Sequence, residues 1–479
     1  MSELRARQFV NGKLVGSARH GIARNPATGA VLGHYADAEE NQGAQAIAAA
    51  RAAFEDTAWP SDRRLRSTVL LRIADAVEAR TEELVRLLAE ENGKTLGQAR
   101  FELGLTPSKL RYYAALALTD TGRAAEVRPG LHVRSLAEPV GVAGIITPWN
   151  SPVVLSVRAF APALAAGCTA VLKFPGQTAL VTGVLNEILA EIPELPAGVL
   201  NAVTESGNDI ARLLVRSPDI RALSYTGSTA VGRRIMADAA PLLKRLSLEL
   251  GGKSPMIVFE DADLDAVVPA LTAGITTFAG QFCMAGSRIL AQRGIADELR
   301  GRLAAALEAV RVGPGDDPRT EMGPLIDAES VRRVDELVTA ALAEGATAVV
   351  RGGPVAPGEP VGYYRPVLLE PPDVHAPMVQ QEVFGPVATF ERFGTEDEAI
   401  GRANATEFGL AAAVWTRDAD RPARVGRRLA AGTVWTNDWA VVVDQFEEGG
   451  FRQSGLGRLN GERGLAEFQE TKTYVHAVA

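Results

Sequence analysis

The chain has 479 residues, more than one ordinary hydrophobic core holds, so we expect two or three domains. Its hydrophobic content of 47% is ordinary for a globular protein, and its net charge of −8 argues against nucleic-acid and anionic-membrane partners. The apolar runs are too short to span a bilayer, and the N-terminal residues lack the apolar core of a signal peptide. Two cysteines cannot form a disulfide framework and five scattered histidines show no ligand spacing, so we expect a cytoplasmic protein without a protein-bound metal.

The N-terminal part of the chain reads as scaffold. Residues 1–35 have the pattern of short strands and turns. Apolar side chains then recur at every fourth position over residues 62–80, which predicts an amphipathic helix. We expect two more helices over residues 81–91 and 103–118, and we assign no chemistry to this region.

Two segments have the pattern of strands outside the main sheets. Residues 121–139 are arginine-rich and roughly alternating, which predicts either an exposed hairpin that pairs with another chain or a plain surface excursion. Residues 473–478 alternate like an edge strand. This strand is expected either to add to the hairpin near residue 130 or to join a neighbouring subunit's sheet.

Strands and helices alternate between residues 140 and 250, and such alternation predicts a parallel, doubly wound α/β sheet with ligands at the carboxyl ends of its strands. The expected strands are 140–147, 170–174, 199–203 and 220–225, and the expected helices are 152–166, 178–192, 209–216 and 228–239. A second α/β block is expected from residue 254 to about 437, with a helix over 331–344, a strand over 346–350 and a capping box at 395–398.

A thiol and a carboxylate are the first candidates for chemistry. Cys283 lies in glycine-flanked backbone, and Glu249 ends an apolar strand just before the pair Gly251-Gly252. A thiol is a candidate nucleophile and a carboxylate a candidate base. Each alone has a commoner structural explanation, because single cysteines are mostly small buried hydrophobes and a glutamate after a strand mostly caps it in solvent.

Three further features are expected at the carboxyl edge of the first sheet. Gly227 and Ser228 open a helix, where free N–H groups suit a phosphate. Lys173 ends a strand and either donates to ribose hydroxyls or points at water, and Asn150 offers an amide donor to an oxyanion unless it serves only its own turn. Together with the thiol and the carboxylate, these groups fit covalent oxidation of a carbonyl with hydride transfer to a nicotinamide.

The chain resembles the aldehyde dehydrogenase superfamily along nearly its whole length. The matching segments are ITPWN (146–150), YTGSTAVG (225–232), LELGGKSP (248–255), GQFCMAGSRI (280–289), QEVFGPV (381–387), AAGTVWTN (430–437) and GGFRQSGLGR (449–458). The resemblance implies an α/β fold with two doubly wound parallel-sheet domains and a small β oligomerisation extension. The NAD(P)-binding domain is expected to comprise residues 1–120 and 140–250, the catalytic domain 251–455, and the extension 121–139 and 456–479, with a homodimer or homotetramer as the assembly.

The resemblance also implies residue roles. Cys283 attacks an aldehyde as its thiolate, the Asn150 amide and the Cys283 backbone N–H hold the oxyanion, and Glu249 activates the water that hydrolyses the thioester. The residues expected to bind the cofactor are Thr147, Trp149, Lys173, Gly227, Ser228, Glu382 and Phe384.

The choice of cofactor is affected by one departure from the family pattern. The family often carries Lys-Pro-Ser-Glu where this chain has Lys173-Phe-Pro-Gly176. The absent glutamate would accept from a ribose 2′-hydroxyl and would repel a 2′-phosphate. Its absence predicts that NADP is tolerated, and we still expect NAD as the cofactor because no new arginine replaces the glutamate.

Arg158, Phe282 and Met284 are expected in the substrate pocket, and Glu447-Glu448 stand where the family commonly has an aromatic residue. Several family members that act on aromatic aldehydes also carry arginine at the position of Arg158. This arginine either faces the substrate tunnel or is a charge on a helix surface. The resulting hypothesis is an aromatic or hydroxy-aromatic aldehyde.

Three other functions stay open at this point. A CoA-acylating semialdehyde dehydrogenase would keep the fold, although Glu249 as a hydrolytic base favours water as the acceptor. A cysteine hydrolase without redox chemistry is disfavoured by the phosphate-compatible turn. A catalytically silent structural protein on this fold is disfavoured by the intact Cys283, Glu249 and Asn150.

Overall fold

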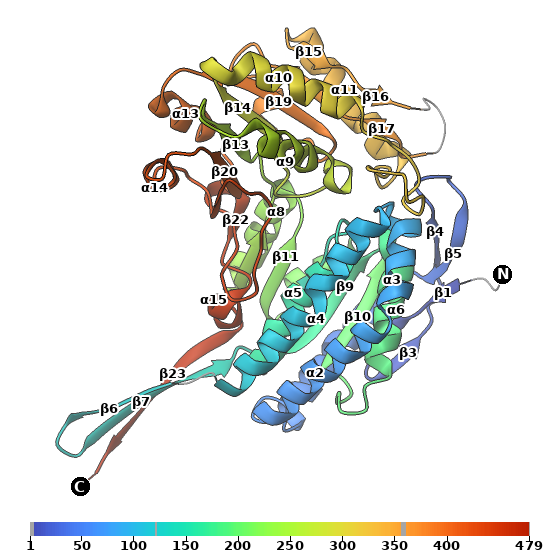
Figure 1. Cartoon of the computed structure of the whole chain (residues 1–479). Helices are drawn as coiled ribbons and strands as arrows, with labels where there is room; N and C mark the ends of the chain where they lie inside the picture. The colour runs from blue at the N-terminus through green and yellow to red at the C-terminus, as the bar shows by residue number, and fades with distance from the viewer. Residues whose placement is uncertain (1–3, 120–121, 356–360, 479) are drawn as a thin grey trace.

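The computed structural model describes residues 4–119, 122–355 and 361–478. It shows two α/β lobes, each built around its own sheet, and an arm of three strands that projects from them (Figure 1). The fold therefore confirms the expected class of two doubly wound parallel sheets with a small β extension.

The first sheet has eight strands in the order β22-β12-β11-β8-β9-β10-β2-β3. Its five central strands are parallel: β12 (Arg245–Glu249), β11 (Ile220–Thr226), β8 (Val142–Ile146), β9 (Thr169–Pro175) and β10 (Leu200–Glu205). The antiparallel edges are β22 (Gly455–Leu456), β2 (Gln8–Val10) and β3 (Lys13–Val15). The chain thus returns to the first sheet after it has formed the second.

Helices cover both faces of this sheet, which explains why its central strands are continuous apolar runs. In β8, Ala143 and Ile145 pack into one core while Val142 and Ile146 pack into another. The first core is closed by α2 (Arg63–Ala79), α4 (Leu96–Thr119), α5 (Pro152–Ala166) and α6 (Ala179–Ala190). The second is closed by α1 (Glu40–Asp56), α7 (Asp209–Arg216) and α8 (Thr229–Ala239).

The N-terminal helices differ from expectation mainly at their ends. Asp62 caps α2 as its N-cap by accepting from the Leu65 N–H at 2.9 Å. The helix expected over residues 81–91 is α3 (Thr81–Leu87) followed by a π-helical turn. Helix α4 starts seven residues before the expected residue 103, and α1 was not expected, because alanines supply most of its buried side chains and leave a weak apolar pattern.

The second sheet has seven strands in the order β15-β18-β19-β14-β13-β20-β21. Their bounds are β13 (Pro255–Val258), β14 (Arg288–Gln292), β15 (Thr347–Val350), β18 (Val367–Glu370), β19 (Val387–Phe393), β20 (Ala411–Trp415) and β21 (Thr433–Thr436), of which only β15 is antiparallel among the described strands. The helices are α9 (Leu264–Thr276), α10 (Arg293–Glu308), α11 (Ala328–Ala343) and α13 (Glu396–Ala403). Thr395 caps α13 by accepting from the Glu398 N–H at 3.2 Å, but the expected capping box is only half formed, because the Glu398 carboxylate accepts from the Gly394 N–H at 2.7 Å.

The projecting arm consists of β6 (Arg123–Arg128), β7 (Leu131–Pro139) and β23 (Gln469–Ala477) (Figure 1). Strand β23 pairs antiparallel with β7 from Gln469 opposite Pro139 to Ala477 opposite Leu131. The C-terminal strand therefore adds to the hairpin of its own chain. Residue 121, the first of the expected extension, lies outside the described residues, and so does 479, the last.

Smaller elements complete the fold. They are β1 (Leu4–Ala6), β4 (His20–Arg24), β5 (Val31–Ala36), β16 (Gly353–Pro354), β17 (Tyr364–Arg365), α12 (Pro377–Gln380), α14 (Arg421–Gly426) and α15 (Gly461–Ala466). Within the described ranges, no helix has both the length and the apolar character that a bilayer crossing needs. The same residues contain no cluster of three or more His, Cys, Asp or Glu side chains that could hold a metal ion.

Candidate active site

Cys283 lies in a tightly wound loop after α9. The loop includes Phe278, Ala279 and Gly280, whose φ angles are 52°, 53° and 71°. Non-glycine residues rarely adopt this left-handed region, and such strain occurs mainly where surrounding structure enforces it. Here Gln281 fixes the loop, because its side-chain oxygen accepts from the Ile326 N–H at 2.9 Å and its amide nitrogen donates to the Phe278 carbonyl at 3.1 Å.

Glu249 ends β12, and the glycine pair that follows allows neighbouring segments to pack closely against this end of the strand. A Cβ at Gly252 would lie 2.6 Å from the Cys283 carbonyl oxygen, and a Cβ at Gly251 would lie 2.2 Å from a Glu382 carboxylate oxygen. At Gly252 the near atom is backbone, so only glycine fits there, whereas at Gly251 it is the end of a side chain that could move aside. The Gly251-Gly252 turn therefore brings the thiol loop and Glu382 against the end of the strand that carries Glu249.

A cleft of about 360 Å³ is lined by most of the predicted chemical groups. Its lining includes Cys283, Glu249 and Asn150. Cys283 and Asn150 also line a second cavity of about 80 Å³. The thiol and the amide thus lie between two spaces, one on each side. The Asn150 amide donates to the Gln281 carbonyl at 3.1 Å, and since an amide nitrogen carries two hydrogens, one is left for a ligand.

The surroundings of the cleft favour the protonated forms of its acidic side chains. Burial, together with the nearby Glu249 and Glu382, raises the pKa of the Cys283 thiol to about 12, while Arg158 opposes the rise. Burial likewise raises the pKa of Glu249, which Arg158, Arg458 and the Gly450 N–H oppose. Burial raises the pKa of Glu382 to about 7. Without a ligand the thiol is therefore protonated at neutral pH, and a base must remove its proton before it can attack.

We expect alkylation of Cys283 to show this raised pKa directly. Only the thiolate reacts, so the iodoacetamide rate of the cofactor-free protein should increase about tenfold per pH unit from pH 7 to 10. A Cys283→Ala variant gives the background from Cys168, which is fully buried. A rate that levels off below pH 8 would contradict the expectation.

Five of the predicted cofactor residues line the cleft with the thiol: Trp149, Gly227, Ser228, Glu382 and Phe384. The rings of Trp149 and Phe384 meet edge to face, with centroids 5.5 Å apart. Ser228 caps α8 by accepting from the Val231 N–H at 3.4 Å. Glu382 accepts from the Gly252 N–H at 3.1 Å.

Thr147 and Lys173 are not among the residues that line this cleft. They lie side by side at the ends of neighbouring strands, where the Thr147 hydroxyl and N–H both donate to the Lys173 carbonyl at 3.1 Å. The Lys173 ammonium lies 3.9 Å from a Glu205 carboxylate oxygen, and burial lowers its pKa. Sequence reasoning missed Arg333, which lines the cleft and donates to the Val383 carbonyl at 2.7 Å, so that it anchors the loop of Glu382 and Phe384.

The second cavity carries the predicted substrate residues. Phe282 packs edge to face against Phe278 and Trp439, with ring centroids 5.7 Å apart in both pairs. The Trp439 indole N–H donates to the Met284 carbonyl at 3.0 Å, which fixes the wall next to the thiol. Met284 itself is buried and lines the cavity.

Arg158 faces this cavity and is not a helix-surface charge. Its side chain lines the cavity, and the residue is only 4% exposed. The guanidinium donates to the Glu448 carboxylate and, at 3.2 Å, to the Thr226 hydroxyl. Glu448 was noted in the sequence only as a departure from the family pattern, and since 290 residues separate it from Arg158, no local pattern could link the two.

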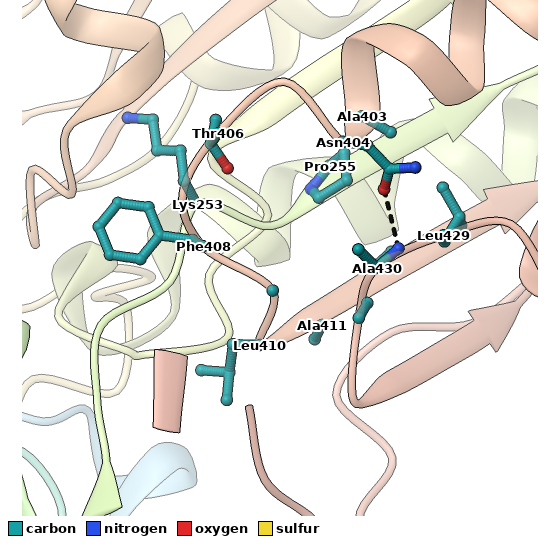
Figure 2. Close-up of a pocket in the computed structure, with 13 residues that line it drawn as sticks. Lys253, Pro255, Ala403, Asn404, Thr406, Phe408, Leu410, Ala411, Leu429 and Ala430 are labelled. Carbon is teal, nitrogen blue, oxygen red and sulfur yellow. Dashed lines mark hydrogen bonds between the residues drawn. The ribbon is translucent and has the colours of Figure 1, made fainter. Parts of the chain in front are cut away.

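Another cavity, of only about 10 Å³, is lined in part by Lys253 and Asn404, and none of the predicted catalytic groups lines it (Figure 2). The Asn404 side chain accepts from the Ala430 N–H at 2.8 Å and holds the wall together. Burial lowers the pKa of the Lys253 ammonium to about 7. This cavity belongs to the interior of the second lobe, so the candidate active site is the pair of spaces around Cys283.

Known proteins of one family match this chain throughout. The model of the aldehyde dehydrogenase family matches residues 16–474. A succinate-semialdehyde dehydrogenase of Paenarthrobacter nicotinovorans is 40% identical over 92% of this chain and 98% of its own length. A betaine aldehyde dehydrogenase of Bacillus subtilis is 37% identical over 97% of this chain and 96% of its own. The crystal structure of a Staphylococcus aureus betaine aldehyde dehydrogenase in complex with NAD+ superposes with a TM-score of 0.96 at 35% identity, over 99% of this chain and 95% of that one. The chain belongs to the aldehyde dehydrogenase family.

Proposed function

We propose that this protein oxidises an aldehyde to its carboxylic acid with NAD+ as the electron acceptor and water as the acyl acceptor. The observation that carries the proposal is the position of Cys283, which lines both the cleft that holds Glu249 and Glu382 and the apolar cavity opposite. A thiol so placed reaches a carbonyl from one space and a cofactor from the other.

The cleft fits a nicotinamide dinucleotide. The turn at Gly227 and Ser228 opens α8, where free N–H groups suit a pyrophosphate, and Glu382 would accept from a ribose hydroxyl. Trp149 and Phe384 supply flat walls. When bound, the cofactor supplies the acceptor for the hydride that leaves the aldehyde carbon.

The remaining steps fall to residues of the chain. Glu249 or a water takes the proton of Cys283 and the sulfur adds to the aldehyde carbon, while the Asn150 amide and the Cys283 backbone N–H stabilise the alkoxide. Oxidation leaves a thioester on the sulfur. Glu249 then takes a proton from water, whose oxygen adds to the thioester carbon, and departure of the thiolate releases the acid.

The surroundings of Lys173 favour NAD+ over NADP+. A Cβ at position 176 would lie 2.3 Å from the Tyr35 hydroxyl, so Tyr35 occupies the space next to Gly176. Both Glu205 and Asp37 act on the Lys173 ammonium and oppose the lowering of its pKa. A carboxylate can accept from a ribose hydroxyl but repels a phosphate, so these neighbours of Lys173 suit the 2′-hydroxyl of NAD+ better than a 2′-phosphate.

The proposal is tested by steady-state kinetics with aliphatic and aromatic aldehydes against both cofactors. We expect kcat/KM to be at least about tenfold higher with NAD+ than with NADP+. Equal or better use of NADP+ would contradict the proposed preference for NAD+ and leave the proposed aldehyde oxidation intact. If no aldehyde reduces either cofactor, the proposed activity fails.

The substrate is proposed to be an aromatic aldehyde, because Phe101, Phe278 and Phe282 line the cavity beside the thiol. A panel in which short aliphatic aldehydes are strongly preferred would rule this out. Product formation that requires CoA would restore the CoA-acylating alternative.

We also propose a cytoplasmic homodimer or homotetramer built through the arm of β6, β7 and β23. Strand β6 is exposed throughout and presents an unpaired edge among the described strands, which suits pairing with a second copy. Sedimentation of the intact chain would measure the assembly.

A further inference from the structure

We propose that Asn460, Lys109 and Asp444 form a neutral, hydroxyl-binding subsite on the wall of the aldehyde cavity. The inference rests on the proposed function and specifies its substrate: an aromatic aldehyde whose ring carries an uncharged hydroxyl-bearing substituent. All three residues line the cavity together with Cys283.

The subsite is a buried hydrogen-bonded cluster. The Lys109 ammonium, on α4, lies 2.7 Å from both the Asp444 carboxylate and the Asn460 side-chain oxygen. An ammonium has hydrogens to donate and no lone pair, so the amide oxygen of Asn460 must face it. This contact fixes the orientation of the amide and directs its Nδ2 away from Lys109.

The Nδ2 of Asn460 has no hydrogen-bond partner among the described residues, although the residue is 0% exposed. Nor does the buried Nε of Arg158, on the same cavity wall, find an acceptor within the described chain. A buried donor without a partner costs free energy. The Asn460 backbone is moreover held at φ = 55° and ψ = 179°, a strained conformation that is otherwise almost confined to glycine. We infer that a ligand oxygen accepts from this amide.

The charges of the cavity wall are already paired within the chain. Lys109 pairs with Asp444, Arg158 with Glu448, and Glu102 with Lys94. A substrate carboxylate or quaternary ammonium would lose its hydration here without meeting an uncompensated opposite charge. A hydroxyl suits the site better, because it can accept from the Asn460 amide and donate to the Asp444 carboxylate.

The pairing of charges on the cavity wall predicts a different substrate from those of the relatives that are named for charged aldehydes. Succinate semialdehyde is an anion and betaine aldehyde a cation at neutral pH. Neither finds a compensating charge on this wall, whereas Phe101, Phe278 and Phe282 supply contacts for a ring.

The experiment compares ring-substituted benzaldehydes of matched shape with the full-length enzyme. The pair 4-(hydroxymethyl)benzaldehyde and 4-ethylbenzaldehyde differ only in a hydroxyl for a methyl, and the 3-substituted pair covers the other geometry. We expect kcat/KM for the hydroxymethyl compound of at least one pair to be about tenfold higher than for its ethyl partner. The 4-carboxy and 4-trimethylammonio compounds should fall below both.

Two charge-changing variants distinguish recognition from a merely structural role. Asp444→Asn leaves Lys109 without its carboxylate, so kcat/KM for the carboxy compound should rise about tenfold relative to the ethyl compound. Asn460→Asp retains the contact with Lys109, replaces the donor by a charged acceptor, and should favour the trimethylammonio compound instead. Asn41→Asp makes the same chemical change on the exposed first turn of α1 and should alter neither ratio.

The subsite is overturned if wild-type enzyme uses both hydroxymethyl compounds no better than their ethyl partners, or if neither variant shifts its ratio. Oxidation of all the benzaldehydes at equal rates would sink the subsite and leave the proposed function intact. Absence of oxidation with every aldehyde would instead remove the proposed function.

Discussion

Replacing Cys283 by alanine is expected to abolish aldehyde oxidation, with a loss of about four orders of magnitude or more in kcat. The loss should be this large because the sulfur forms the covalent bond in every step that we propose. Cofactor affinity should change little, since Glu382, Ser228 and the Trp149–Phe384 pair remain in place. Quenching of the protein's tryptophan fluorescence by NAD+, to which Trp149 in the cleft should contribute, measures binding separately from turnover.

The matched control is Cys168→Ala. Cys168 is also a free thiol, but it is fully buried in the first core and contacts the Phe468 carbonyl at 3.3 Å. Its replacement should lower thermal stability slightly and leave kcat unchanged. A Cys283→Ala enzyme that retains more than about one hundredth of the wild-type rate would contradict covalent catalysis.

Most layers of the fold were predictable because most elements, though not α1, have a clear local sequence pattern. Strand β8 is a continuous apolar run, as a strand covered on both faces must be, and α5 begins at Pro152 and occupies the expected residues 152–166. Helix α11 starts three residues before the expected 331 because Asp327 caps it by accepting from the Ser330 N–H at 2.7 Å. The family motifs likewise placed Cys283, Glu249 and Asn150, which the structure brings to one cleft.

The chemistry of the substrate side was not predictable in the same way. The bond from Lys109 to Asn460 joins residues 351 apart, and the pairing of Arg158 with Glu448 spans 290. Such pairs leave no periodicity or spacing in a single sequence. What identifies them is that each buried charge has a partner of opposite charge or a hydrogen-bond acceptor, and these partners meet only in the folded chain.

Glu249→Gln is expected to separate acylation from deacylation. Glutamine keeps the shape of the side chain and removes its basicity, so the first turnover proceeds and hydrolysis of the thioester stalls. Mixing the variant with aldehyde and NAD+ should give a rapid burst of about one equivalent of NADH per active site, followed by a steady rate at least about a hundredfold below wild type. Stopped-flow absorbance of NADH resolves the two phases.

A second role for Glu249 predicts a different outcome. If its carboxylate also removes the Cys283 proton, the raised thiol pKa of about 12 leaves almost no thiolate in the variant, and the burst disappears with the steady rate. Hydroxylamine distinguishes the two cases, because it attacks a thioester without help from a base. Hydroxylamine should restore turnover where the thioester accumulates and should have no effect where acylation has failed. A burst shows that the thiol is deprotonated without Glu249. A burst that hydroxylamine cannot convert to turnover shows in addition that no thioester accumulates, and it would therefore exclude both roles for the Glu249 carboxylate.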